Sequence, residues 1–230
     1  MGRWWRAQRL LALPQGSRVL DLGCAFGFGT GLLAPRYEAY GHDLSGPYIE
    51  RARRSVPDAT FTRGEAESIP YPDAYFDGIL LLDVLEHVPD DEAVVREIAR
   101  ALRPGGPLVV TVPNRGVLQR WDSLNVFARW SGPAGTAPTD DPSWPRVQHH
   151  RHYSEGDLRQ ILEPRFRIRG VSYTGVGVAE PVNLLLLLFR RKMPRLYEAL
   201  QYLYFAVYLA EDLIPAGSWG YHLTLVADRA

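Results

Sequence analysis

A glycine-rich loop and an acidic residue farther along the chain are the first candidates for chemistry. Residues 19–29, VLDLGCAFGFG, run from an apolar stretch into glycines, and Gly23 and Gly27 allow the backbone to turn tightly and approach a ligand. Asp43 lies 20 residues beyond Gly23, where a carboxylate can accept hydrogen bonds from both hydroxyl groups of a ribose. A loop and an acid at this interval predict a cofactor that contains a nucleoside.

The details of this loop help to choose the cofactor. Its glycines stand at positions 23, 27, 29 and 31 and lack the G-x-G-x-x-G spacing of dinucleotide-binding folds, which argues against a nucleotide-dependent oxidoreductase. Asp21 lies just ahead of the loop, and a carboxylate there attracts a cation rather than a pyrophosphate. S-adenosylmethionine carries an ammonium and a sulfonium group, so the loop favours this cofactor.

A second candidate is the run Asp83-Val84-Leu85-Glu86-His87. If a helical turn begins there, the spacing places Asp83, Glu86 and His87 close together. Two carboxylates and an imidazole can hold a divalent metal, but the same side chains can also line an acceptor pocket without one. We expect no metal here, and we expect Glu86 or His87 to face the acceptor as a catalytic group.

A third candidate is a group of histidines, His149, His150 and His152, that follows a long predicted loop over residues 131–148. Three histidines in four residues suggest zinc, although histidines in a loop are more often solvated or bonded to the backbone. A histidine with an ordinary pKa of about 6.5 is also suited to act as a general base. We predict His152 as that base, with His149 as the second choice.

Seven short stretches predict the strands that must hold these groups, and helical patterns fall between them. Residues 76–83, FDGILLLD, are apolar almost throughout, which is typical of a strand covered on both faces in a parallel sheet. Strands that alternate with helices form βαβ units, so the sequence predicts an α/β fold. The predicted strands are residues 19–22, 38–43, 60–62, 76–83, 108–112, 166–173 and 221–227.

An oily stretch, residues 182–214, separates the last two predicted strands. It is apolar nearly all round, so its helices must be buried against something. They could form a cap on the sheet, a lid over a bulky apolar acceptor or a homodimer face. They could also anchor the chain at a membrane surface, where Arg190, Arg191, Lys192 and Arg195 would meet lipid headgroups. These alternatives favour a hydrophobic acceptor such as a quinone, a polyketide or an isoprenoid.

Composition narrows the partners and the compartment. The 230 residues include 26 basic and 26 acidic ones, so the net charge is zero and binding to nucleic acid through overall charge is not expected. Cys24 is the single cysteine, which excludes an internal disulfide and favours a reducing, cytoplasmic location. The apolar run near the N-terminus, residues 10–13, is shorter than a signal peptide's apolar region, and no stretch has the length of a membrane span. We expect one domain over residues 1–230, in the cytoplasm or at the periphery of a membrane.

Several segments in succession resemble the motifs of one enzyme family. VLDLGCAFGFG, GHDLS, GEAESIPYPDAYFDGILLLDVLEHV and LRPGG are similar to the motifs of class I S-adenosylmethionine-dependent methyltransferases, in the type-11 branch that includes enzymes of quinone biosynthesis. The resemblance is strongest over residues 17–113. It implies a Rossmann-like, doubly wound sheet of seven strands, with an antiparallel last strand and a helical insertion before it. It also implies S-adenosylmethionine as the cofactor and methyl transfer to a small molecule.

The resemblance also implies roles for individual residues. Asp21 and Gly23 would lie near the methionine end of the cofactor, with Gly27 in the same loop. Asp43 would bind the ribose, Leu44 would pack beside the adenine, and Glu65 and Ala66 would contact the adenine amino group. Asp83 and Val84 would form the floor beneath the sulfonium. Ala25 stands where the family usually has glycine, a mild change for which we expect a slight effect on affinity. The segment of His152 would lie over the acceptor site. The alternative function is a relative that binds the cofactor without turnover, as a noncatalytic partner.

Overall fold

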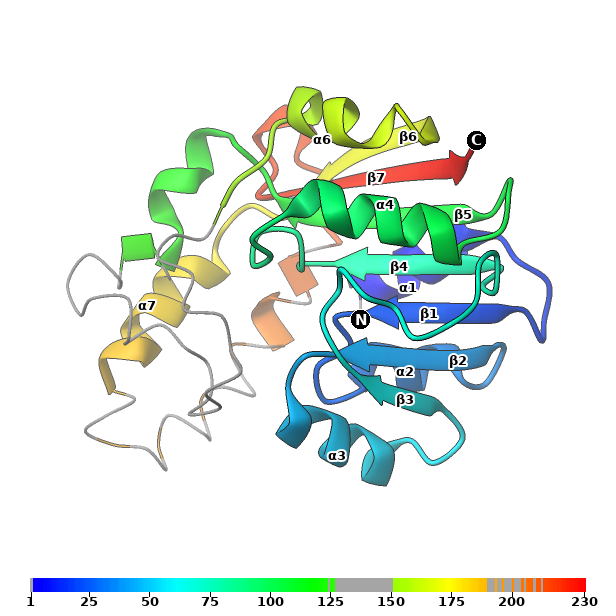
Figure 1. The fold of residues 1–230 in the computed structure, drawn as a ribbon. Helices are drawn as coiled ribbons and strands as arrows, with labels where there is room; N and C mark the ends of the chain where they lie inside the picture. Colours follow the sequence, from blue (N-terminus) through cyan, green and yellow to red (C-terminus); the bar gives the residue numbers. More distant parts are fainter. Residues whose placement is uncertain are drawn as a thin grey trace.

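The computed structural model describes most of the chain, and its strands form a seven-stranded sheet (Figure 1). The described residues are 2–123, 125–126, 151–189, 193, 196, 200, 204, 206–208, 210–211 and 213–230. The strands are β1 (Arg18–Leu22), β2 (Glu38–Asp43), β3 (Thr60–Arg63), β4 (Gly78–Leu82), β5 (Pro107–Pro113), β6 (Phe166–Thr174) and β7 (His222–Arg229). Each one overlaps the strand predicted for that part of the sequence.

The order of the strands across the sheet is β3-β2-β1-β4-β5-β7-β6. The strands from β3 to β5 are parallel to their neighbours, whereas β7 is antiparallel to both β5 and β6. This arrangement confirms the predicted Rossmann-like fold with an antiparallel last strand. The chain runs outward in opposite directions from β1 and β4, and ligands of open α/β sheets bind outside the carboxyl ends of the strands at such a point.

Helices cover both faces of the sheet, as expected for a doubly wound fold. In Figure 1, α4 and α6 lie in front of the sheet, while α1 and α2 lie behind it. The helices are α1 (Gly2–Leu11), α2 (Phe28–Leu33), α3 (Gly46–Ser55), α4 (Asp91–Ala101), α6 (Glu155–Leu162) and α7 (Ala179–Phe189), with the 3-10 helices η1 (Val117–Trp121) and η3 (Gly217–Trp219). The carboxylate of Asp90 accepts a hydrogen bond from the N–H of Ala93 (2.8 Å) and caps α4.

The apolar core occupies both faces of the sheet because alternate side chains of β4 point to opposite sides. Ile79 and Leu81 pack into the cluster that contains residues of α4 and α6, whereas Leu80 and Leu82 join the cluster that contains Leu11 of α1. Burial of a side chain of this size stabilises the fold by about 1.5–3 kcal/mol relative to an exposed position. The frame fixes the carboxyl ends of the central strands, from which the loops of the site emerge.

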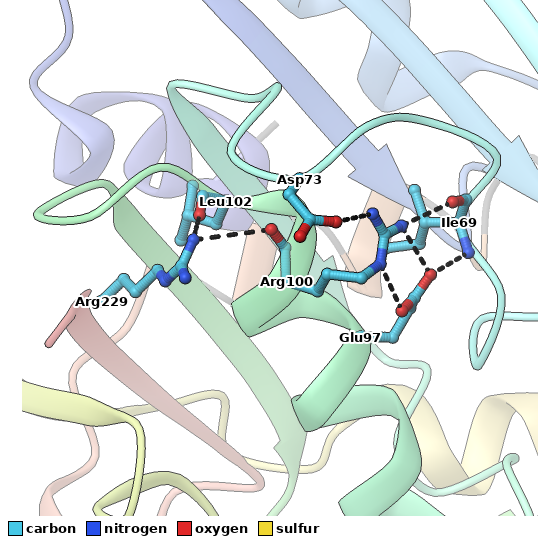
Figure 2. A network of polar contacts seen from close by, with 6 residues as sticks. All are labelled: Ile69, Asp73, Glu97, Arg100, Leu102 and Arg229. Atoms are coloured by element: carbon cyan, nitrogen blue, oxygen red, sulfur yellow. Dashed lines mark hydrogen bonds and ion pairs between the residues drawn. The ribbon is translucent and has the colours of Figure 1, made fainter.

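A network of polar contacts holds the segment after β3 against α4 (Figure 2). Arg100 donates hydrogen bonds to the carboxylates of Glu97 (2.8 and 2.9 Å) and Asp73 (2.7 Å) and to the carbonyl oxygen of Ile69 (2.9 Å). Glu97 also accepts a bond from the N–H of Ile69 (2.7 Å). The Arg100 guanidinium holds the pKa of Glu97 below its ordinary value, so this carboxylate stays charged. The network therefore fixes Ile69 and Asp73, which follow the loop that begins with Glu65, against α4.

The helical insertion lies between β6 and β7, where the sequence predicted it. Helix α7 starts at Ala179, slightly ahead of the predicted stretch of residues 182–214, and residues 204, 206–208 and 210–211 are also helical. In Figure 1, α7 lies beyond the carboxyl ends of the parallel strands. Among the described residues, no helix combines the length and the apolar character that crossing a bilayer requires. The predicted loop 131–148 and both His149 and His150 lie outside the described residues.

Candidate functional site

A cavity of about 640 Å³ lies at the carboxyl ends of β1 to β4, between the loops that follow these strands. Tyr204 and Tyr208 of the insertion contribute to the same wall. The other lining residues are 22–26, 28–29, 42–44, 64–67, 82–84 and 87–89. Most of the positions predicted to bind the cofactor line this cavity, namely Gly23, Ala25, Asp43, Leu44, Glu65, Ala66, Asp83 and Val84. The fold therefore brings together residues that are up to 61 positions apart between Gly23 and Val84.

The glycine loop is packed directly against the end of β4. Gly23 has a φ of +82°, in the left-handed region that favours glycine. A Cβ atom at this position would lie 2.2 Å from Cγ2 of Val84. The N–H groups of Gly23 and Cys24 both donate to the carbonyl oxygen of His42 (2.8 and 3.2 Å). Position 23 therefore requires glycine for two reasons. Its backbone is in the left-handed region, and the side chain of Val84 occupies the space that a Cβ atom would need.

Asp43 holds the same loop from the end of β2. Its Oδ2 accepts a hydrogen bond from the N–H of Ala25 (2.8 Å), and its Oδ1 accepts one from the N–H of Ser45 (2.9 Å). Ala25 has a φ of +45°, in the left-handed region that favours glycine, and this explains why the family usually has glycine at this position. The sequence suggested only a mild effect of the extra methyl group, but a left-handed alanine costs about 1–2 kcal/mol. The hydrogen bond to Asp43 helps to hold this strained conformation.

Asp21 lies beneath the loop and does not line the cavity. Its carboxylate is fully buried and accepts a hydrogen bond from the hydroxyl group of Thr30 on α2 (2.7 Å). Burial raises the pKa of Asp21 to about 7. Gly27 also does not line the cavity, because it forms the N-terminal cap of α2 with a φ of +83°. These two predicted contacts of the cofactor support the loop from below in this structure.

His42 is a residue of the wall that the sequence analysis did not select. Its Nδ1 lies 2.8 Å from Oγ1 of Thr62, and its Nε2 lies 3.1 Å from the carbonyl oxygen of Glu65. Burial lowers the pKa of His42, which favours the neutral ring. The imidazole therefore joins β2, β3 and the loop of Glu65 and Ala66, and it fixes the side of the cavity where the adenine is expected.

Asp83 marks the far end of the cavity, directly after β4. It has a φ of +57°, which is a strained conformation for a residue other than glycine and is typical of functional sites. The hydroxyl group of Tyr208 lies 3.4 Å from Oδ2 of Asp83 and 3.1 Å from Nε2 of His222. The insertion and the first residue of β7 thus meet the end of β4 at this point.

A smaller cavity of about 170 Å³ adjoins the first one. The two share Asp83, His87, Tyr204 and Tyr208 in their walls. Most residues that line the smaller cavity have polar side chains, and its remaining lining residues are Glu86, Pro113, Asp122, Ser123, Glu180, Asn183, Tyr221 and His222. Of the two catalytic candidates that the sequence selected, His87 therefore lies where the cavities meet, whereas Glu86 lines the smaller cavity alone. In the described ranges, no three side chains of the metal-binding types are grouped as a metal site requires.

His152 lies in neither of these cavities. Its Nε2 is 3.2 Å from Oδ2 of Asp122, and its side chain is 8% exposed. It lines a separate surface pocket of about 490 Å³, together with Arg115 and Arg151. The structure thus connects the predicted base to the smaller cavity through Asp122 and through the ring of Tyr221, which meets the imidazole edge to face with centroids 6.5 Å apart. The second choice, His149, is outside the described part of the chain.

Sequence reasoning missed Tyr204, Tyr208, Asp122 and His222, which complete the walls. Two weak signals were available. Tyr204 and Tyr208 are four residues apart on a predicted helix, which places them on one face. His222 begins the last strand, and its register partner is Pro113 at the carboxyl end of β5. Neither signal identifies a site residue until the order of the strands in the sheet is known.

Comparisons with known proteins agree with this geometry. Residues 20–110 match a family model described as a methyltransferase domain, of type 11. The chain is 37% identical over 113 residues to 27-O-demethylrifamycin SV methyltransferase of Amycolatopsis mediterranei, a match that covers 46% of this chain and 42% of that protein. It is 34% identical over 102 residues to fatty-acid O-methyltransferase of Mycolicibacterium smegmatis, with 42% and 37% covered. The matched part is less than half of the length of these relatives.

The whole fold has a counterpart among solved structures. The cyclase SpnF superimposes with a TM-score of 0.64 and 18% identity, and the match covers 98% of this chain and 79% of that one. At this identity the likeness shows the fold alone, whereas the family match rests on the segment that lines the cavity. The match over residues 20–110 and the named relatives support a class I S-adenosylmethionine-dependent methyltransferase of the type-11 kind.

Proposed function

We propose that this chain transfers the methyl group of S-adenosylmethionine, the methyl donor of its family, to a small acceptor molecule. The observation that carries the proposal is the cavity of about 640 Å³, because its wall combines the glycine loop, Asp43, the Glu65 loop and the turn after β4. Such a combination at the carboxyl ends of parallel strands suits a nucleoside cofactor. The reaction needs the donor and the acceptor to be held in line, which is chiefly a matter of positioning.

The residues present fit this cofactor. The carboxylate of Asp43 is fixed by two backbone N–H groups, and a carboxylate has about four acceptor sites, so it can still accept hydrogen bonds from two ribose hydroxyl groups. Leu44 and Ala66 offer apolar surface for an adenine. Gly23 lets the glycine loop pack closely against Val84, where a Cβ atom would collide. When bound, the cofactor supplies a methyl group on a sulfonium sulfur.

The chain's own residues at the far end of the cavity orient the acceptor and exclude water. Tyr204 and Tyr208 stand in the wall opposite Asp83 and close this end from the side of the insertion. His87 lines both cavities and Glu86 lines the smaller one, and we retain them as candidates for groups that face the acceptor. His152 is the weaker candidate, because it lines neither cavity and is turned toward Asp122.

For the acceptor we propose a molecule with an apolar body. The far end of the larger cavity has apolar and aromatic walls, provided by Val88, Pro89, Tyr204 and Tyr208. One relative methylates fatty acids, according to its name. The smaller cavity, whose lining residues mostly have polar side chains, would then receive the polar group that carries the reacting atom. The buried, free thiol of Cys24 suits the cytoplasmic location that we propose.

The insertion has an apolar surface that supports a proposal about partners. Val182 and Leu185 of α7, together with Leu213 and Ile214 ahead of β7, are exposed. We propose contact with a membrane surface or with a second copy of the chain. Pelleting with anionic lipid vesicles would support the first, and a dimer in sedimentation velocity would support the second. If the chain neither pelleted nor dimerised, the insertion would be a cap on its own domain.

Transfer of labelled methyl groups tests the main proposal. The chain is incubated with methyl-labelled S-adenosylmethionine and a panel that contains a fatty acid, a prenylated hydroquinone, a simple phenol and an alkylamine. We expect label on at least one acceptor with the natural chain and with Gly105→Ala, and none with Gly23→Ala. Binding of S-adenosylhomocysteine without transfer to any acceptor would favour the noncatalytic alternative, and absence of binding would reject both.

A further inference from the structure

Tyr208 and His222 form a hydrogen-bonded pair that the expected methyltransferase motifs do not include. Tyr208 comes from the insertion, and His222 is the first residue of β7. The hydroxyl oxygen of Tyr208 lies 3.1 Å from Nε2 of His222, and the two rings meet edge to face with centroids 5.4 Å apart. His222 is 1% exposed. Of the two cavities, His222 lines the smaller one and Tyr208 lines both, so the hydrogen bond links the imidazole to the wall of the larger cavity.

The direction of this hydrogen bond decides what the pair can do. The Tyr208 hydroxyl has one proton and two neighbours, Nε2 of His222 at 3.1 Å and Oδ2 of Asp83 at 3.4 Å. If Tyr208 donates to His222, the imidazole carries its proton on Nδ1 and can receive another on Nε2. If His222 donates to Tyr208, the hydroxyl donates to Asp83 and the imidazole can take no proton from this side. The distance to His222 is the shorter of the two, so we take donation from Tyr208 to His222 as the premise that the first experiment below tests.

We propose that Tyr208 and His222 carry away the proton of the acceptor, a step that rests on the proposed methyl transfer. The donor contributes the methyl carbon, which bonds to the acceptor atom while the carbon–sulfur electron pair stays on sulfur. The acceptor's proton passes to the oxygen of Tyr208 as the tyrosine's own proton passes to Nε2 of His222. Tyr208 ends as a neutral phenol and His222 as an imidazolium, which later releases its proton to water.

The surroundings of His222 suit this role. The carboxyl groups in the wall of the same small cavity are Asp83, Glu86, Asp122 and Glu180. The other titratable groups in that wall are His87, Tyr204, Tyr208 and Tyr221. Ionised carboxylates nearby stabilise the positive charge that His222 acquires during the step. His152 does not compete for the proton, because its Nε2 faces Asp122 and it lines neither cavity.

Nuclear magnetic resonance tests the direction of the hydrogen bond without any acceptor. The chain is labelled with nitrogen-15 histidine, and the signals of His222 are assigned with His222→Gln. We expect the neutral ring to carry its proton on Nδ1, and we expect Tyr208→Phe to shift the Nε2 signal. Tyr204→Phe, one helical turn away, should leave that signal in place. A proton on Nε2 of the neutral ring in the natural chain would overturn the proposal.

Binding and turnover separate this proposal from the proposed function. Titration with S-adenosylhomocysteine should give the same affinity within about twofold for the natural chain, Tyr208→Phe and His222→Gln. No binding by the natural chain would reject the methyl transfer itself. With an acceptor from the panel, we expect both variants to lower kcat at least about 100-fold and to remove the acidic limb of its pH profile. If the acidic limb of the kcat profile is unchanged in His222→Gln, proton transfer through Tyr208 to His222 is overturned, and His87 becomes the candidate base.

Discussion

Replacing Gly23 with alanine tests how the glycine loop meets the end of β4. The new Cβ would lie 2.2 Å from Cγ2 of Val84, and the backbone would keep a φ of +82°. Gly105 is the matched control, since its φ is +71° and a Cβ atom added to it would meet no other atom within 4 Å. It lies in the turn between α4 and β5, away from the cavity. Both changes impose the same backbone strain, but only Gly23→Ala adds a collision.

The two effects have different magnitudes. A left-handed alanine costs about 1–2 kcal/mol, which is the whole effect expected for Gly105→Ala. Overpacking adds about 1–3 kcal/mol, so Gly23→Ala should lower the free energy of unfolding by about 2–5 kcal/mol. Val84→Ala removes the colliding methyl groups. In the double variant the overpacking should disappear, and the coupling energy between the two sites should be about 1–3 kcal/mol.

Urea unfolding followed by tryptophan fluorescence measures these energies, and the six tryptophans provide the signal. A lower midpoint with an unchanged slope reports lost stability rather than a changed denatured state. If Gly23→Ala and Gly105→Ala are destabilised equally, or if Val84→Ala fails to rescue Gly23→Ala, the loop does not pack on β4 as described.

Three further predictions follow from the same structure and are checked by urea unfolding. Ala25→Gly should raise the free energy of unfolding by about 0.5–1 kcal/mol, because its φ of +45° suits glycine; a loss of stability would contradict this. Arg100→Gln should lower the free energy of unfolding by about 1.5–3 kcal/mol, because it breaks the charged hydrogen bonds with Glu97. The control Arg96→Gln, on the exposed side of α4, should change this free energy by less than about 0.5 kcal/mol. Burial raises the pKa of Asp21 to about 7, so the folded protein keeps a proton that the unfolded chain releases at a pH of about 4. Stability should therefore fall as the pH rises from about 4 to about 7, and Asp21→Asn should lessen this fall; an identical pH dependence in the variant would show that Asp21 is not the group.

The sequence predicted the frame well because the frame depends on local patterns. The continuous apolar run of residues 76–83 contains the buried strand β4, and Asp90 caps α4 through a contact three residues away. The glycine loop was also accessible, since Gly23 and Asp43 stand at the ends of two neighbouring parallel strands. Contacts of this kind follow from periodicity and from the sheet order that periodicity implies.

The parts that escaped prediction depend on contacts between distant segments. Its charge and the family resemblance both suggested that Asp21 lies near the cofactor, but its carboxylate is buried beneath the loop and bonded to the hydroxyl group of Thr30. His152 belongs to a conspicuous group of histidines, yet its imidazole turns to Asp122, 30 residues earlier in the chain. The contact of Tyr208 with Asp83 joins positions 125 residues apart. No local sequence pattern predicts where the insertion packs.

Titration calorimetry with S-adenosylhomocysteine is the most direct test of the proposed cofactor site. The natural chain and Gly105→Ala should each bind one equivalent with equal affinity. Gly23→Ala, measured under conditions where it remains folded, should bind at least about tenfold more weakly, which corresponds to about 1.4 kcal/mol. Absence of binding by the natural chain, or equal affinity in Gly23→Ala, would contradict a cofactor held by the glycine loop at the carboxyl ends of β1 and β4.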